Sequence, residues 1–185
     1  EATPEIIDQN DFDAVIVAVG AEQIVPRIPG VEKAKMSFDV FGHEEIVGKK
    51  VVIIGGGAIG VELGIHLNGL GHECTIVEMA EYLASKAQLT ERTAYLINLE
   101  KNHVASMVNT TCQEITDKGV WVENAEGRTF IEADTVIIAV GTKPLVNERE
   151  KFKDVAFDVI SVGDCVEASS IVHAVHTGFD AGLTL

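Results

Sequence analysis

The chain has few basic residues. Its 185 residues contain 14 Lys and Arg against 29 Asp and Glu, which gives a formal net charge of −15. Proteins that bind nucleic acid or an anionic membrane surface depend on Lys and Arg for much of their affinity. The composition therefore predicts neither nucleic acid nor a membrane as a partner.

Cysteine pairs and long apolar runs are also missing. Cys74, Cys112 and Cys165 are far apart, odd in number and without a C-x-x-C pair, so we expect no metal site and a reduced, intracellular setting. No apolar run approaches the roughly 20 residues that span a bilayer, and the acidic start lacks the regions of a signal peptide. We expect a cytoplasmic protein. Because no Met begins the sequence, we also expect a piece of a longer chain.

One stretch, residues 51–78, reads VVIIGGGAIGVELGIHLNGLGHECTIVE. The β-branched run 51–54 is typical of a parallel strand buried on both faces, and apolar residues at helical spacing predict a helix over 58–70. A second apolar strand, 74–78, closes the unit. The order of strand, Gly-x-Gly-x-x-Gly loop, helix and strand predicts a dinucleotide-binding βαβ unit; the alternative is a structural turn that binds no nucleotide.

The small residues of the loop fit a pyrophosphate on a helix N-terminus. Gly55 would make the tight turn, Gly57 would let the backbone approach the phosphates, and Gly60 would let the helix pack closely on the first strand. The predicted cofactor-binding loop is completed by Gly56, Ala58 and Ile59.

An acid at the end of the second strand favours NAD over NADP. Glu78 lies where a carboxylate accepts hydrogen bonds from a ribose hydroxyl and repels a 2′-phosphate. The next four residues, which begin with Met79, include no base that could bind that phosphate. We therefore predict NAD(H) as the cofactor, with Glu78 and Met79 among its contacts.

The rest of the chain predicts further α/β structure. The strand AVIVAVG at 14–20 recurs as TVIIAVG at 135–141. Between the copies we expect a helix over 90–101 capped by Thr90, a strand at 104–108, and a three-stranded antiparallel meander over 110–116, 120–123 and 128–131. Near the end, Asp164 follows a strand, where open α/β sheets bind ligands, although from the residues alone a plain helix N-cap is the commoner role.

Taken in order, these pieces resemble the pyridine nucleotide–flavin oxidoreductases, flavoproteins with two dinucleotide-binding domains. The resemblance is carried by AVIVAVG with PRIPG, GGGAIGVE, TIVE, the meander, IIAVGTKP and VGDC. It implies an α/β fold, with a Rossmann-like parallel sheet and the meander. It also implies an NAD(P)H domain, 45–144, inserted in a truncated FAD domain formed by 1–44 and 145–185. The FAD domain's own glycine-rich unit is missing from this sequence.

The same resemblance implies roles for three more residues. Glu62 would lie near the nicotinamide end of the cofactor, although an acid in a first helical turn can also simply stabilise the helix dipole. Gly141 would line the nicotinamide groove, and Asp164 would contact FAD. Hydride transfer from NADH to FAD is performed by the cofactors, so no catalytic residue is expected from this chain.

Within that family the sequence is most similar to the 2-enoate reductase and 2,4-dienoyl-CoA reductase type of NADH:flavin oxidoreductases. The resemblance implies N-terminal domains as partners: the other half of the FAD domain, and an FMN barrel with an iron–sulfur cluster that reduces an α,β-unsaturated substrate. We expect the fragment alone to be inactive. A ferredoxin or disulfide reductase, an NADH oxidase, and a non-catalytic NAD-binding module remain alternatives.

Overall fold

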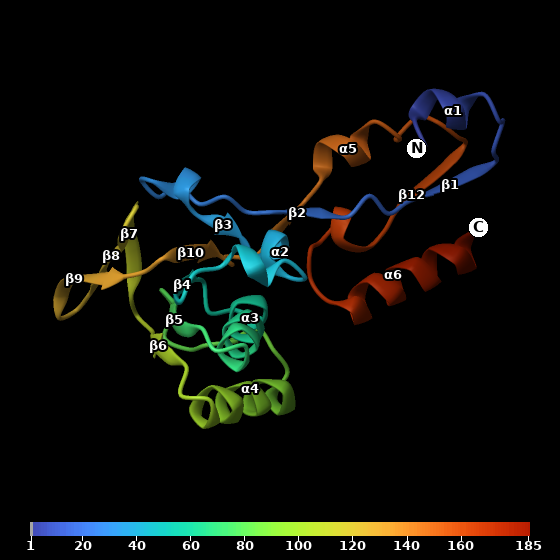
Figure 1. Ribbon diagram of the computed structural model, residues 1–185. Helices are drawn as coiled ribbons and strands as arrows, with labels where there is room; N and C mark the ends of the chain where they lie inside the picture. The colour runs from blue at the N-terminus through green and yellow to red at the C-terminus, as the bar shows by residue number, and fades with distance from the viewer. Residues whose placement is uncertain (1) are drawn as a thin grey trace. The chain divides into compact units, whose positions relative to one another are not determined.

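The computed structural model describes residues 2–185, which form two compact units (Figure 1). The larger unit is the continuous stretch Val25–Gly141. The smaller unit combines the segment up to Ile24 with the segment from Thr142 onward. No helix in the described part of the chain is long and apolar enough to cross a membrane.

A five-stranded parallel sheet forms the centre of the larger unit. Its central strands are rich in β-branched residues and are buried on both faces, because helices and a second sheet cover them. The strand order is β3 (Lys35–Met36), β10 (Thr135–Ile138), β4 (Lys50–Ile54), β5 (Glu73–Val77) and β6 (Ala105–Met107). The strands predicted at 51–54, 74–78 and 104–108 are confirmed, with ends that differ by one or two residues.

Helices cover one face of this sheet. Val51 and Ile53 of β4 belong to the same buried cluster as Leu63 and Leu67 of α3. The two long helices of the unit are α3 (Ala58–Gly69) and α4 (Leu89–Lys101). The prediction that Thr90 caps α4 is wrong: Gln88 is the N-cap, without a side-chain cap bond, so Thr90 already lies in the first turn.

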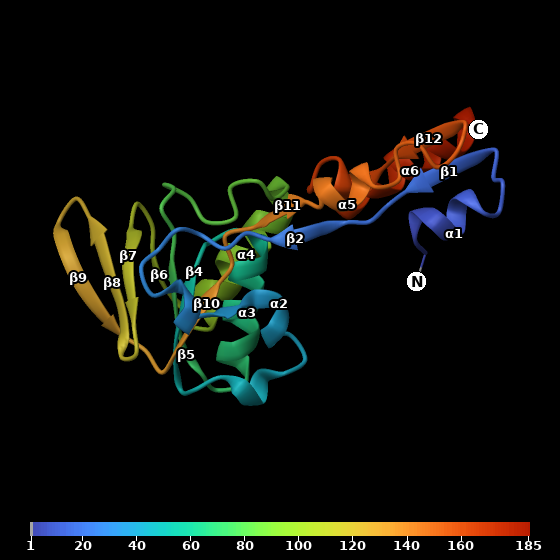
Figure 2. The ribbon, with the colours of Figure 1, turned by 90° about the horizontal axis from the view of Figure 1, so that it is seen from above.

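The antiparallel meander covers the other face, so the sheet lies between the helices and the meander (Figure 2). Val52 and Ile54 of β4 pack in one cluster with Val120 and Val122. The meander consists of β7 (Thr111–Thr116), β8 (Gly119–Asn124) and β9 (Gly127–Glu132), as predicted. The short elements of this unit are η1 (Val31–Lys33), α2 (Ser37–Val40) and η2 (Glu44–Ile46).

The smaller unit contains two small sheets. In one, β1 (Ala14–Val17) runs parallel to β12 (Asp158–Ser161); in the other, β2 (Ala21–Gln23) runs antiparallel to β11 (Thr142–Pro144). Its helices are α1 (Pro4–Asp8), α5 (Val146–Glu150), η3 (Gly163–Cys165) and α6 (Ile171–Thr184). The repeated strands, β1 and β10, lie in different sheets, but the segments that follow them pair with each other.

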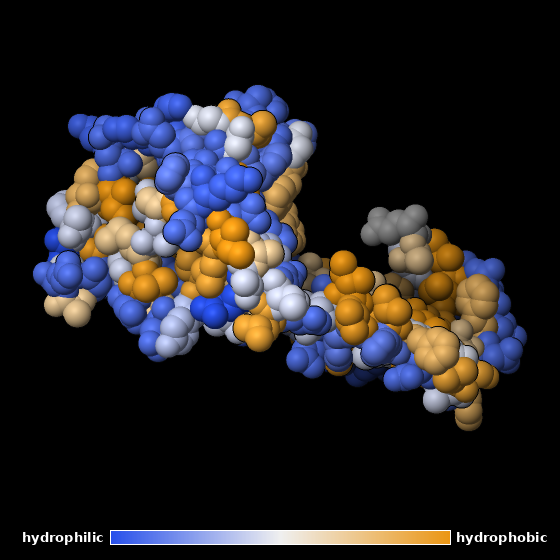
Figure 3. Space-filling model, turned by 90° about the horizontal axis from the view of Figure 1, so that it is seen from below, coloured by the Kyte–Doolittle hydropathy of each residue, from blue (hydrophilic) through white to orange (hydrophobic). Residues whose placement is uncertain are grey.

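Much of the apolar surface of the smaller unit is exposed. On α6 the exposed fractions are 84% for Ile171, 65% for Phe179 and 70% for Leu183. Orange, apolar side chains gather over this unit in Figure 3. Parallel sheets are normally covered on both faces, which two strands and a few helices do not achieve.

The units divide the chain at Ile24/Val25 and Gly141/Thr142, whereas the sequence predicted divisions after residues 44 and 144. Residues 25–44 join the larger unit because β3 pairs with β10, with Lys35 opposite Ile137. The segment Thr142–Pro144 joins the smaller unit as β11. The assignment of the flanking segments to an FAD domain stays a prediction.

Candidate functional site

The glycine loop follows β4 at the carboxyl edge of the parallel sheet, where open α/β sheets bind ligands. Gly55 has a φ of +110°, and a Cβ there would collide with the Ala139 carbonyl oxygen of the strand-end beside it. A Cβ at Gly60 would collide with the Gly55 carbonyl oxygen. These two positions need glycine so that the chain can turn sharply and α3 can approach the end of β4.

Gly57 differs, because an added Cβ would meet no atom within 4 Å. It is the N-cap of α3 and carries no capping side chain. Within residues 2–185, no protein acceptor is bonded to the amides of Gly57, Ala58 and Ile59. Free amides at the positive end of a 12-residue helix, beside open space, can bind an anion such as a phosphate.

The half-buried Glu78 carboxylate is bonded to the loop itself. One oxygen accepts from the Gly56 amide at 2.6 Å, and the other accepts from the Ala80 amide at 2.7 Å. The structure thus brings Glu78 next to the loop, as the βαβ spacing predicts. It also assigns the Gly56 amide to Glu78, so this amide differs from the free ones of Gly57 and Ala58.

The segment after Glu78 folds over Gly56. The Ala84 amide donates to the Gly56 carbonyl at 2.7 Å, and a Cβ on Gly56 would collide with the Leu83 side chain. Met79, by contrast, is 74% exposed at the start of this segment. Sequence reasoning missed Leu83, because it is one of several apolar residues in the segment after Glu78 and nothing in the sequence sets it apart.

A basic residue that the sequence did not single out lies near this segment. The Arg92 guanidinium lies 5.3 Å from the centre of the Tyr82 ring, and its Nε donates to the Leu83 carbonyl at 2.9 Å. The sequence placed no base directly after Glu78. In three dimensions, Arg92 reaches the same loop from α4.

Glu62 is bonded to α4. Its carboxylate accepts a hydrogen bond from the Tyr95 hydroxyl, and that hydroxyl also lies 3.0 Å from a Glu91 carboxylate oxygen. Burial, and then the bonds to these carboxylates, raise the pKa of Tyr95 above its usual value. The structure therefore joins Glu62 to Tyr95, a partner that the sequence did not indicate.

Gly141 and Asp164 belong to different units. Gly141 lies two residues after Ala139, whose carbonyl oxygen adjoins Gly55 of the loop. Gly141 follows β10, has a φ of +106° and has open space at its Cβ position. Asp164 belongs to the smaller unit, in η3, where its carboxylate accepts from the Ser169 amide at 3.4 Å. A hollow beside it is lined by Ser170 and Ile171 at the start of α6. The predicted roles of both residues stay predictions.

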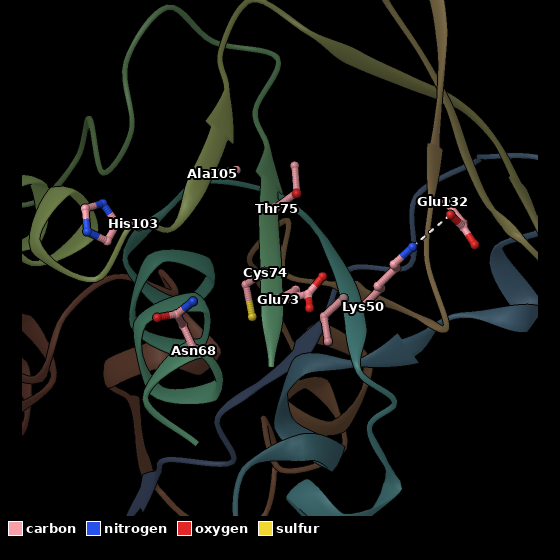
Figure 4. Close-up of a pocket in the computed structure, with 9 residues that line it drawn as sticks. Lys50, Asn68, Glu73, Cys74, Thr75, His103, Ala105 and Glu132 are labelled. Carbon is pink, nitrogen blue, oxygen red and sulfur yellow. Dashed lines mark hydrogen bonds and ion pairs between the residues drawn. The ribbon is translucent and has the colours of Figure 1, made fainter. Parts of the chain in front are cut away.

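Another hollow lies at the opposite, amino edge of the sheet (Figure 4). The first residues of three strands, Lys50, Glu73 and Ala105, line it. Lys50 is paired with Glu132 at 2.9 Å, and burial raises the pKa of the Cys74 thiol to about 11. In this hollow the lysine is already paired and the thiol is un-ionised at neutral pH, so neither group is available to bind a ligand or react. We therefore place the candidate site at the glycine loop.

Comparison with known proteins agrees with this geometry. Residues 7–160 match the pyridine nucleotide-disulphide oxidoreductase family. The chain belongs to this family. The family resemblance and the Rossmann-like α/β fold predicted from the sequence are thereby confirmed. Members of this family are in general flavoproteins that use NAD(P) and FAD.

Relatives of the chain include reductases and an oxidase. The chain is 37% identical to the bilirubin reductase of Mediterraneibacter gnavus, over all of this chain and 29% of that protein. It is 34% identical to the NADH oxidase of Thermoanaerobacter brockii, over 96% of this chain and 29% of that protein. A 2-naphthoyl-CoA reductase complexed with 2-naphthoyl-CoA superposes with a TM-score of 0.92, at 28% identity, over 100% of this chain and 29% of its own. The chain thus spans less than a third of each relative.

Proposed function

We propose that this chain binds NADH through Val25–Gly141 and is part of a longer flavoprotein that reduces an α,β-unsaturated substrate. When bound, NADH supplies a hydride, which FAD accepts. A bilirubin reductase and a 2-naphthoyl-CoA reductase among the relatives support a reductase of this kind.

The observation that carries the proposal is the glycine loop. Within residues 2–185, the amides of Gly57, Ala58 and Ile59 have no protein acceptor, and the Cβ position of Gly57 faces open space. The Glu78 carboxylate accepts from the preceding amide, that of Gly56. The residues present therefore fit a dinucleotide: a pyrophosphate needs free amides, and a ribose needs a hydrogen-bond acceptor beside them.

Each residue of the loop has a proposed task. The amides of Gly57, Ala58 and Ile59 hold the pyrophosphate, while Gly55 and Gly60 keep the turn narrow. Glu78 accepts from the adenosine ribose, and the exposed Met79 contacts the adenosine portion. We further propose that Gly141 lines the nicotinamide groove and that Glu62 lies near the nicotinamide end, with its carboxylate held by Tyr95.

We propose NAD(H) rather than NADP(H). A 2′-phosphate placed at Glu78 would meet a carboxylate, and like charges at a few ångströms repel. Arg92 of α4 contacts the loop that follows Glu78, but its Nε is already bonded to Leu83 and its guanidinium lies over Tyr82.

The residues present offer only part of an FAD site. Asp164 and the adjoining start of α6 offer a carboxylate and a helix N-terminus, but the described chain contains no second glycine-rich βαβ loop. We propose that N-terminal domains of the same protein complete the FAD domain and cover the exposed face of α6. A barrel with FMN and an iron–sulfur cluster would precede them, in a cytoplasmic enzyme.

An NADH oxidase is the second candidate, favoured by the Thermoanaerobacter relative. A ferredoxin or disulfide reductase shares the same NADH-binding unit, and a non-catalytic NAD-binding module would share the loop without a flavin. The colour of the longer protein separates these classes: a flavoprotein is yellow and bleaches when NADH is added. A colourless protein would favour the module.

The first test is a titration of the 185-residue chain with NADH, followed by nicotinamide fluorescence. We expect saturable binding, weaker binding of NADPH, and no turnover by the chain alone. The proposal fails if NADH causes no fluorescence change while added FAD binds tightly.

A further inference from the structure

Tyr95 links the glycine-loop helix to its neighbour. Its half-buried side chain rises from α4, and its hydroxyl donates to the Glu62 carboxylate on α3. The same hydroxyl lies 3.0 Å from Glu91, one turn earlier on α4. A phenol has a single proton to donate, so the closer carboxylate, Glu62, is its principal acceptor.

The location of Glu62 gives this bond a consequence. Glu62 is four residues after Ala58, so both lie on the same face of α3, separated by a rise of about 6 Å. The Ala58 amide has no protein acceptor among the described residues. A carboxylate on this face, free to turn toward the helix start, would place a negative charge close to the amides that bind an anion.

We propose that Tyr95 is a positioning residue for the dinucleotide site. It holds the Glu62 carboxylate toward α4 and so keeps that charge away from the first-turn amides of α3. The proposal rests on the proposed function, in which those amides hold the pyrophosphate of NADH. It deepens that function by naming a residue that acts on the site through another side chain.

A double-mutant cycle tests this role. The Kd for NADH is measured by fluorescence for the unmodified chain, Tyr95→Phe, Glu62→Gln and the double variant. We expect Tyr95→Phe to weaken binding about two- to tenfold, the usual range for one lost hydrogen bond. In the Glu62→Gln background the same change should have no effect, because the charge that Tyr95 holds is gone.

Two further measurements distinguish positioning from a merely structural role. The effect of Tyr95→Phe should shrink at high salt, since screening weakens the repulsion of a released carboxylate. Glu91→Gln is the matched control: it removes the other carboxylate but keeps the bond from Tyr95 to Glu62, so it should change the Kd less than Tyr95→Phe does.

The outcomes separate this inference from the proposed function. If the unmodified chain binds no NADH, the proposed function fails and this inference fails with it. If NADH binds, but Tyr95→Phe leaves the Kd unchanged or weakens binding equally with and without Glu62, only the positioning role is overturned. Melting temperatures of all variants show whether a weakened Kd reflects lost folding.

Discussion

Replacing Glu78 by alanine should loosen the glycine loop and weaken NADH binding together. The carboxylate accepts from the amides of Gly56 and Ala80 at 2.6 and 2.7 Å. Hydrogen bonds to a charged group contribute about 1.5–3 kcal/mol each, but water can replace the exposed bond to Ala80. We therefore expect a net loss of about 2 kcal/mol, or about 4–8 °C in melting temperature for a chain of this size.

The assay combines thermal unfolding with NADH and NADPH titrations. Glu81→Gln is the matched control, because Glu81 is an exposed carboxylate on the same loop with no bonded partner in the described chain. It should change neither the melting temperature nor the ratio of the two affinities. If Glu78→Ala behaves like Glu81→Gln, Glu78 neither holds the loop nor binds the ribose, and the reasoning is refuted.

Glu78→Arg adds a charge to the same perturbation. Cofactor preference should swing toward NADPH, because the carboxylate that repels a 2′-phosphate is replaced by a cation. The Gly56 amide also loses its acceptor, so the variant should unfold at a lower temperature than the unmodified chain. A changed preference without this stability loss would show that the bond to Gly56 contributes little.

Three further predictions concern other residues. Gly60→Ala should destabilise the fold by about 1–3 kcal/mol, because its Cβ collides with the Gly55 carbonyl. Gly57→Ala should leave the melting temperature unchanged and weaken NADH binding about tenfold. Equal losses of melting temperature in the two variants would contradict this contrast. Hydrogen bonds from the Gly42 amide, from the Glu44 amide itself and from His66, in that order of effect, lower the pKa of Glu44 to about 2, below its ordinary 4.5. Its contribution to stability should be present above pH 4.5 and lost as pH falls toward 2, and Glu44→Gln should flatten the melting temperature in that window. Because burial raises the pKa of Cys74 to about 11, a thiol reagent at pH 8 should modify it only in unfolded chain, as mass spectrometry would show.

The parallel core and the glycine loop could be predicted because local sequence determines them. A β-branched run such as Val51–Ile54 fits a strand buried on both faces, and helical spacing of apolar residues defines α3. The need for glycine at Gly55 and Gly60 is also local, because a Cβ at either position would collide with a backbone oxygen in the neighbouring strand-end or five residues earlier in the loop. The meander was visible through its two turns.

Contacts between distant segments could not be predicted in this way. The bond from Tyr95 to Glu62 depends on how α4 packs beside α3, and neither residue type is distinctive on an exposed helix face. The contact of Leu83 with Gly56 depends on the path of a loop. The first unit boundary lies at Ile24/Val25, not after residue 44, because β3 pairs with β10. With only two residues, Lys35–Met36, β3 is too short to show a periodic pattern in the sequence.

The ribbon of β2 and β11 determines how the larger unit is attached. Gln23 and Thr142 are opposite each other in that ribbon, so the chain leaves the smaller unit and returns to it within about one strand spacing, roughly 5 Å. A module whose entry and exit points adjoin can be exchanged as a cassette without altering the fold that carries it. Grafting Val25–Gly141 between equivalent ribbon strands of a related reductase would therefore test the proposal that this unit alone binds NADH.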